Sequence, residues 1–500
     1  MSPHRDDGSD RGGPGIANAP DPTNGPGAAA ATAGWGPAIV WFRDDLRLAD
    51  NPALHAAVER GLPLLAVYVL DEESPGVRPL GGASRWWLHG SLRALGDSLE
   101  ALGGSLLLRR GPAIEVIGAL AASVGAGAVF WNRRYGAAER DVDTAIKAGL
   151  QAKGVEARSF AGSLLFEPWT IRTGQGNPYS VFTPFWRACV AAAPPREPCP
   201  APTAIDFWPV GAVGPASDTL DDWSLLPTRP DWAAGLRAAW QPGETSAAEA
   251  LDTFLCEALP RYADERDAPA QAATSRLSPR LRWGEVSPYQ VWHATQRVLR
   301  GADAATAKSA RRFLTELGWR EFSYHVLFHT PELATENLKR EFDRFPWPPL
   351  DEQALEAWRH GRTGIPLVDA GMRELWQTGS MHNRVRMVTA SFLTKNLLVD
   401  WRMGERWFWD TLVDADGASN PFGWQWVAGS GADAAPYFRV FNPELQAARF
   451  DPHGEYIRQY VPEIGTDAYP EPLVDLGETR RAALAAYEQV KSAKPALPVP

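Results

Sequence analysis

The apolar positions of residues 37–166 fall into short continuous runs separated by segments of helical period. Runs rich in Val, Ile, Leu and aromatic residues occupy 38–42, 63–70, 105–109 and 128–132, and a helical pattern covers 85–95. Continuous apolar strands that alternate with helices are typical of a parallel, doubly wound sheet. We therefore expect an α/β domain over residues 37–166.

Charged side chains follow two of these expected strands. Arg43 and Asp44 come after the first strand, and Asn132 to Tyr135 end the fourth. Ligands of such sheets bind at the carboxyl ends of strands, so these residues are either ligand contacts or ordinary loop charges, and the pattern leaves both open. No Gly-rich phosphate motif follows the first strand, which disfavours a dinucleotide-dependent dehydrogenase.

Two segments have little periodicity. Residues 1–36 are mostly Gly, Pro, Ala and Asp and cannot bury enough apolar surface to offset their ordering entropy, so we expect a disordered tail. Residues 167–235 are rich in Pro, Trp and Asp. Loops of this length often bridge domains, which indicates an interdomain connector.

Helical periods dominate residues 236–475. Patterns cover 247–255, 308–328, the segment after Pro366, and 383–400. The segment after Pro366 directs Val368, Met372, Leu375 and Trp376 to one face, and the segment 383–400 directs Val385, Val388, Phe392 and Leu393 inward. Asn383, Arg386 and Met387 share another face of that segment, a candidate ligand wall. The fold expected is α/β then all-α, with only a short polar tail over residues 476–500.

Composition narrows the functional classes. A chain of 500 residues is too long for one ordinary core, and its apolar fraction of 45% is normal for a globular protein. There is no apolar run of about 20 residues and no signal-peptide pattern. Cys189, Cys199 and Cys256 lack metal-ligand spacing, so we expect no metal site and a cytoplasmic protein. The net charge of −10 argues against general nucleic-acid binding but permits a local basic groove.

The residue types suited to chemistry lie in the helical half. The segment 274–279 offers hydroxyls, amides and a guanidinium for a phosphate, although the hexapeptide taken alone favours an ordinary helix cap. Asp414 and Asp416 suit a sugar or ring edge, or a solvated acidic turn. His382 is expected to be a hydrogen-bonded structural residue. The chain has 22 Trp, each of which, taken singly, is more typical of packing than of function.

The combination of motifs resembles the photolyase/cryptochrome family, over residues 39–462. The resemblance is carried by the segments 41–47, 181–186, 274–279, 319–322, 381–387 and 414–436. It implies an α/β domain followed by a helical domain that holds FAD, at residues 236–475.

The resemblance implies a role for each matching residue. Contacts to FAD are expected from Tyr262, Thr274, Ser275, Arg276, Leu277, Ser278, Phe313, Arg320, Asn383, Arg386, Asp414, Asp416 and Asn420, with Asn420 facing flavin N5. Trp424, Trp401 and Trp347 match a chain that passes electrons to the flavin. Glu316, Trp319, Asn383, Met387 and Trp426 match catalytic residues that bind a cyclobutane pyrimidine dimer, and Arg384 is a further expected DNA contact.

These matches imply light-dependent repair of UV-damaged DNA, with a blue-light photoreceptor that signals through a protein partner as the alternative. Asn420 favours repair, because plant cryptochromes usually carry Asp there. Asn383 disfavours repair of six-four photoproducts, whose enzymes carry a second histidine near this position. A second, light-harvesting chromophore is expected in the N-terminal domain, methenyltetrahydrofolate or alternatively a deazaflavin. In the best-known bacterial class the folate-contacting glutamate would fall at Gly136. Phosphate contacts are expected from Arg384, Lys395 and Arg439, and the protein is expected to be a monomer.

Overall fold

The computed structural model describes residues 36–211, 214–433 and 438–492. A five-stranded parallel sheet, ordered β3-β2-β1-β4-β5, forms the N-terminal part. Its strands are β1 (Ala38–Phe42), β2 (Leu64–Leu70), β3 (Leu106–Arg110), β4 (Ala128–Asn132) and β5 (Glu156–Phe160). The four strands expected from the apolar runs are confirmed. The fifth, β5, was not predicted, because the edge strand Glu-Ala-Arg-Ser-Phe has no apolar run.

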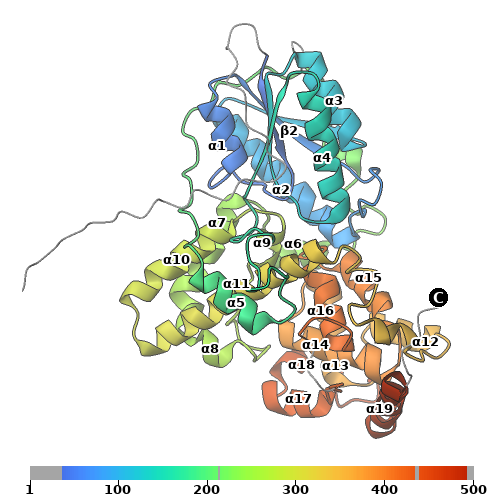
Figure 1. Cartoon of the computed structure of the whole chain (residues 1–500). Coiled ribbons are helices and arrows are strands. Elements are labelled where there is room, and N and C mark those ends of the chain that lie inside the picture. Colours follow the sequence, from blue (N-terminus) through green and yellow to red (C-terminus); the bar gives the residue numbers. More distant parts are fainter. Residues whose placement is uncertain (1–35, 212–213, 434–437, 493–500) are drawn as a thin grey trace, which may run out of the picture.

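Helices cover both faces of the sheet (Figure 1). Helices α1 (Pro52–Glu59) and α2 (Gly82–Ala101) pack with one core, and α3 (Ala113–Val124) and α4 (Ala137–Gln151) with the other. Alternate residues of β1 enter the two cores, Val40 on the first side and Ile39 on the second. Because both faces are buried, the strands read as continuous apolar runs rather than as alternating ones.

The segment expected to be a connector contains α5 (Phe182–Ala191), η1 (Asp221–Trp223) and the start of α6 (Ala234–Ala239). Helix α5 lies among the helices of the C-terminal part, where Phe182 and Phe185 join their core (Figure 1). Trp223 instead joins the core of the sheet. This segment therefore contributes to both parts of the molecule.

The rest of the described chain is helical. Its elements are α7 (Glu244–Thr253), η2 (Phe254–Ala258), η3 (Leu259–Arg261), α8 (Tyr262–Glu265), α9 (Ser278–Arg282), α10 (Pro288–Gly301), α11 (Ala304–His329), η4 (Arg340–Arg344), α12 (Glu352–Arg359), α13 (Pro366–Thr378), α14 (Asn383–Ser391), η5 (Phe392–Asn396), α15 (Trp401–Thr411), α16 (Ser419–Ala428), α17 (Pro443–Phe450), α18 (Glu455–Tyr460) and α19 (Leu476–Ser492). The α/β then all-α architecture is confirmed. No helix in the described ranges is long and apolar enough to span a bilayer.

Three local predictions need correction. The helix expected over 383–400 ends in a π-helical turn at Asn396, and Asp400 caps the next helix instead. Trp376, expected on the buried face of α13, is 53% exposed. The tail expected over 476–500 is wrong for residues 476–492, which form α19. The inward residues of α19 include two alanines, Ala483 and Ala486, so its apolar signal is weak. The tail expected at 1–36 lies outside the described residues, apart from Gly36.

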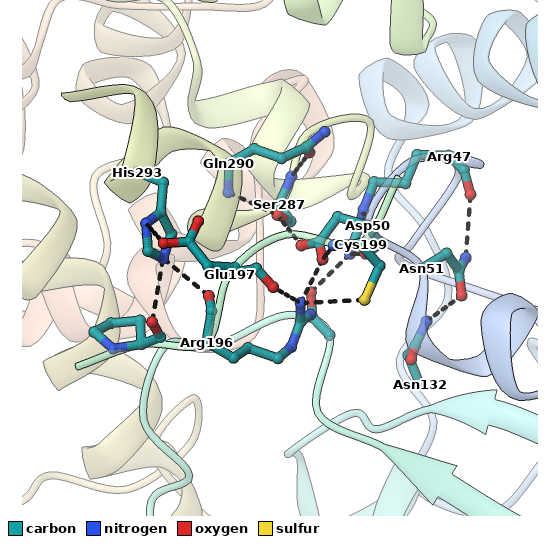
Figure 2. A network of polar contacts seen from close by, with 12 residues as sticks. Arg47, Asp50, Asn51, Asn132, Arg196, Glu197, Cys199, Ser287, Gln290 and His293 are labelled. Carbon is teal, nitrogen blue, oxygen red and sulfur yellow. Dashed lines mark hydrogen bonds and ion pairs between the residues drawn. The ribbon is translucent and has the colours of Figure 1, made fainter. Parts of the chain in front are cut away.

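A buried polar network joins the sheet domain to the helical part (Figure 2). The carboxylate of Asp50, fully buried, accepts from the hydroxyl of Ser287, from Arg196 at 2.5 Å and from the amide of Cys199 at 2.9 Å. Ser287 is itself the N-cap of α10. Arg47 spans the same junction by donating to the carbonyl of Gly284 at 2.8 Å.

Three of the polar side chains that follow the strands are engaged within the protein. Arg43 pairs with Asp143 at 2.6 Å, Asp44 pairs with Arg282 at 2.7 Å, and Asn132 donates to the carboxylate of Asp45 at 2.6 Å. Of the two interpretations left open by the sequence, these contacts favour the structural one for Arg43, Asp44 and Asn132.

We expect Asp50→Ala to lower the free energy of unfolding by about 3 kcal/mol, because it removes one partner of a buried charged network. The matched control is Asp231→Ala, which breaks an ion pair whose side chains are 45% and 48% exposed and should therefore cost much less stability. Urea denaturation followed by Trp fluorescence measures both. An equal loss of unfolding free energy in the two variants would show that the buried network around Asp50 stabilises the protein no more than an exposed ion pair does.

Candidate functional site

A cavity of about 560 Å³ opens among α8, α9, α11, α14, α15 and α16. Its volume is in the range of sites for small molecules and cofactors. Most of the expected site residues line it: Tyr262, Ser275, Leu277, Ser278, Phe313, Glu316, Trp319, Arg320, Asn383, Arg384, Arg386, Met387, Asp414, Asp416, Asn420, Trp424 and Trp426. Residues far apart in the sequence thus meet at one site, and the face of Asn383, Arg386 and Met387 is confirmed as a wall of it.

Four of the residues expected to contact FAD or to carry electrons to it do not line the cavity. Thr274 is exposed, and Arg276 turns away to place its guanidinium over the Trp240 ring at 4.1 Å. Trp401 and Trp347 belong to two packed clusters and are not part of the lining. At the hydroxyl-rich end, Ser275 and Ser278 remain in the lining, and Ser278 is the first residue of the short helix α9. This end offers hydroxyls and amides suited to phosphate oxygens.

Charged groups form another part of the lining. Arg386 donates to both carboxylate oxygens of the buried Asp414, at 2.9 and 3.1 Å. Asp416 accepts from the amides of Ala418 and Ser419 at 2.8 and 2.6 Å, at the start of α16. Both bonds to Asp414 come from Nη2 of Arg386, and its Nε donates separately to the carbonyl of Met381 at 2.8 Å, so the guanidinium is held at two points. Asp416 therefore stabilises the turn that begins α16, and it also lines the cavity.

The three indoles of the expected electron chain differ in their surroundings. Trp424 lines it and is 2% exposed; its ring lies over Gly404, where an added Cβ would come within 2.0 Å of the indole. Trp401 belongs to the same core and donates to Asn337 at 2.9 Å. Trp347 is partly buried in a neighbouring aromatic cluster. Of the three indoles of the expected electron chain, Trp424 lines the cavity and Trp401 and Trp347 do not.

Aromatic and charged groups line another part of the cavity. Trp319 stacks on Phe182 with centroids 3.7 Å apart, so one of its faces is occupied by the protein. Glu316 forms ion pairs with Arg266 and, at 3.4 Å, with Arg312. Arg266 and Arg312 also line the cavity but were not predicted, because their pattern in the sequence is that of ordinary solvated helix positions.

Among the expected phosphate contacts, Arg384 lines the cavity and donates to Asp267 at 2.9 Å. Lys395 is different, because it is buried, with 1% exposure. Its ammonium donates to the carbonyls of Val427 and Arg439 at 3.0 and 3.1 Å and lies 3.7 Å from the Phe438 ring centroid. Lys395 as a DNA phosphate contact is therefore wrong; its amphipathic side chain turns inward.

Burial lowers the pKa of Lys395 to about 7. Since the unfolded state holds this proton up to pH about 10.5, it binds more protons than the folded state between pH 7 and 10, and this contribution to stability rises with pH. We expect Lys395→Met to lack this pH dependence. The difference in unfolding free energy between the variant and the native chain should therefore shift by a few kcal/mol in favour of the native chain from pH 7 to pH 10. Urea denaturation at several pH values measures this, and a pH-independent difference would contradict it.

The structural interpretation of His382 is supported. Its Nδ1 accepts from the amide of Arg384 at 3.2 Å, and its Nε2 lies 2.9 Å from the carbonyl of Arg266. One ring nitrogen accepts and the other donates, which suits a neutral imidazole. Burial lowers the pKa of His382 to about 4, in agreement with this tautomer.

The chain is similar to proteins of known families over both of its parts. A family model described as DNA photolyase matches residues 38–203, and one described as the FAD binding domain of DNA photolyase matches residues 313–467. The chain is 50% identical over 480 residues to a deoxyribodipyrimidine photo-lyase of Agrobacterium fabrum, which covers 91% of this chain and 98% of that protein. It is 39% identical to Cryptochrome-1 of Arabidopsis thaliana, over 88% of this chain and 64% of that one.

Two solved structures of similar proteins have the same fold as this chain. A bacterial class III photolyase from Agrobacterium tumefaciens superposes with a TM-score of 0.88 at 48% identity, over 93% of this chain and all of that one. A cryptochrome of Synechocystis superposes with a TM-score of 0.81 at 30% identity, over 90% of this chain and 99% of that one.

Proposed function

This chain belongs to the DNA photolyase and cryptochrome family, and from that membership we propose that it is a light-dependent DNA repair enzyme that splits cyclobutane pyrimidine dimers. The observation that carries the proposal is the grouping of Glu316, Trp319, Asn383, Met387 and Trp426 in one cavity with the polar groups suited to a flavin. Photoreceptors share this scaffold, so the fold alone does not decide the activity. The activity is therefore argued from the residues of the site.

The residues present fit FAD. Ser275, Ser278 and the amide of Leu277 supply donors for the pyrophosphate, and the Arg386–Asp414 pair supplies a fixed charged wall for the ring system. Bound FAD, in its reduced form and excited by blue light, would supply the electron that opens the cyclobutane ring and would take that electron back once the ring has split. The protein holds its ligands in place and, through Trp424, offers an oxidisable side chain beside them.

The protein's own part in repair is to bind and orient the damaged bases. Trp319 and Trp426 offer aromatic faces on which an extruded, splayed base pair can stack. The carboxylate of Glu316, held by two arginines, can accept a hydrogen bond from a base. Arg384 supplies a cation for the phosphate backbone, so binding should weaken with salt. Asn420 and the two indoles favour this function over a photoreceptor that signals through a protein partner.

We also propose that a folate, rather than a deazaflavin, is the second chromophore of the α/β domain. Gly136 lacks the expected carboxylate, but that of Glu139 fills the space beside it, where an added Cβ at Gly136 would lie 2.1 Å away. Nε and Nη2 of the neighbouring Arg134 have no hydrogen-bond partner among the described residues. A carboxylate and a guanidinium suit the donors and acceptors of a pterin. Loss of heat-released pterin fluorescence in Glu139→Gln, but not in Glu115→Gln, tests this; equal retention in both contradicts it.

The protein is proposed to act as a cytoplasmic monomer. The repair function is tested by expressing the chain in a bacterial strain that lacks photolyase and exposing the cells to UV. We expect survival to rise only in cells illuminated afterwards, and Glu316→Ala to reduce the rise. Equal survival in light and in darkness would contradict repair. Photoreduction of a bound flavin in such a protein would then favour the photoreceptor.

A further inference from the structure

Arg78 links the α/β domain to the cavity wall. It lies between β2 and α2, and its guanidinium donates to both carboxylate oxygens of Glu405 on α15, at 2.7 and 2.9 Å. The same guanidinium lies over the Trp409 ring at 3.9 Å from its centroid. A bidentate pair of this kind fixes the rotation of the carboxylate as well as its position.

The surrounding contacts hold the Arg78 loop in place. The indole nitrogen of Trp409 donates to the carbonyl of Pro79 at 2.9 Å, and the amide of Gly82 donates to Asp410 at 2.8 Å. An added Cβ at Gly81 would lie 2.2 Å from the carbonyl oxygen of Trp409, so the two backbones are in close contact. Arg78 is thus held over α15 by the docking of the two domains.

Glu405 in turn fixes the side chain of Asn420, which lines the cavity. Its side chain is 2% exposed, and its Oε1 and backbone carbonyl accept from Nδ2 of Asn420 at 2.8 and 3.0 Å. A carboxylate and a carbonyl only accept hydrogen bonds, so the amide of Asn420 must turn its NH₂ group toward Glu405. The carbonyl oxygen of Asn420 is thereby the part of the amide left to the cavity that this residue lines.

We infer that Arg78 is a positioning residue for the reaction: through Glu405 it keeps Asn420 with its oxygen toward the flavin. This rests on the proposed function, in which Asn420 faces flavin N5. An oxygen acceptor there stabilises a flavin whose N5 carries a proton and disfavours the oxidised flavin, whose N5 is itself an acceptor. The α/β domain therefore helps to set the reduction potential of a cofactor bound in the other domain.

The test uses the full-length, flavin-loaded protein and measures the flavin midpoint potential and flavin content. In Arg78→Met the buried Glu405 loses its cation and Asn420 its fixed orientation, and we expect the potential to fall by about 30 mV, a tenfold change in a two-electron equilibrium. Arg78→Lys keeps a cation without the bidentate geometry and should give a smaller fall. Asp410→Ala removes a contact of the same interface that does not reach Asn420, and should leave the potential unchanged.

An unchanged potential in Arg78→Met would overturn the inference, and so would an equal fall in Asp410→Ala, which would make Arg78 a docking contact only. If Arg78→Met fails to retain flavin, Arg78→Lys decides by the same criteria. A native chain that binds no flavin would overturn the proposed function as well. If the native chain repairs dimers but Arg78→Met has the native flavin midpoint potential, this inference alone is overturned and the proposed function stands.

Discussion

Replacing Trp424 with Phe is expected to abolish most flavin photoreduction, lowering its rate by at least an order of magnitude. Among the three indoles of the expected electron chain, Trp424 lines the cavity, whereas Trp401 and Trp347 belong to packed clusters outside its lining. Phenylalanine keeps much of the packing against Gly404 but is far harder to oxidise, so electrons from outside lose their last short step. Absorbance of the bound flavin under continuous blue light with an external reductant measures the rate.

The same variant should still repair dimers once its flavin has been reduced chemically, because Trp424 is needed to reduce the flavin and not to bind DNA. Trp358→Phe is the matched control, since this indole is also fully buried and packs against Trp424 at 6.2 Å but does not line the cavity. Photoreduction of Trp424→Phe at the native rate would contradict the assigned electron path.

The second large effect is expected at the indoles of the DNA site. Trp319→Ala and Trp426→Ala should each weaken binding of dimer-containing DNA roughly 10- to 100-fold, since stacking of one base on an aromatic side chain contributes about 1–3 kcal/mol. Flavin content should be unchanged. Fluorescence anisotropy of labelled oligonucleotides with and without a dimer measures the affinities.

Trp376→Ala is the control for this pair, because Trp376 is 53% exposed but does not line the cavity. It should bind dimers as the native chain does. If Trp319→Ala and Trp426→Ala lose no more affinity for damaged than for undamaged DNA, the two indoles do not recognise the dimer, and the proposed stacking is wrong.

The sequence predicted the architecture well where apolar periodicity is strong. The β1 run Ala38–Phe42 and the inward face of α14 stand in the structure as expected, because burial on both faces of a strand and on one stripe of a helix leaves a clear pattern. The pattern failed for β5 and α19. An edge strand with alternating polar residues and a helix that buries alanines carry little apolar signal.

The candidate site was predicted from motifs rather than from periodicity, which explains its gaps. Arg266 and Arg312 were missed because nothing in their neighbourhood distinguishes a cation that meets Glu316 from one in solvent. Lys395 was misassigned because a lysine buried without a carboxylate partner is rare, and only the fold reveals the two carbonyls that hold it. Arg78 lies 327 positions from Glu405, and their contact arises only from domain docking.

The central claim is that this cavity repairs pyrimidine dimers by light, and one measurement tests it most directly. Purified protein with chemically reduced flavin is mixed with dimer-containing single-stranded or duplex DNA, and dimers are counted by chromatography after blue light and after darkness. We predict that dimers disappear and intact pyrimidines reappear in equal amount under light only. An unchanged number of dimers in both DNA forms after illumination would contradict the account.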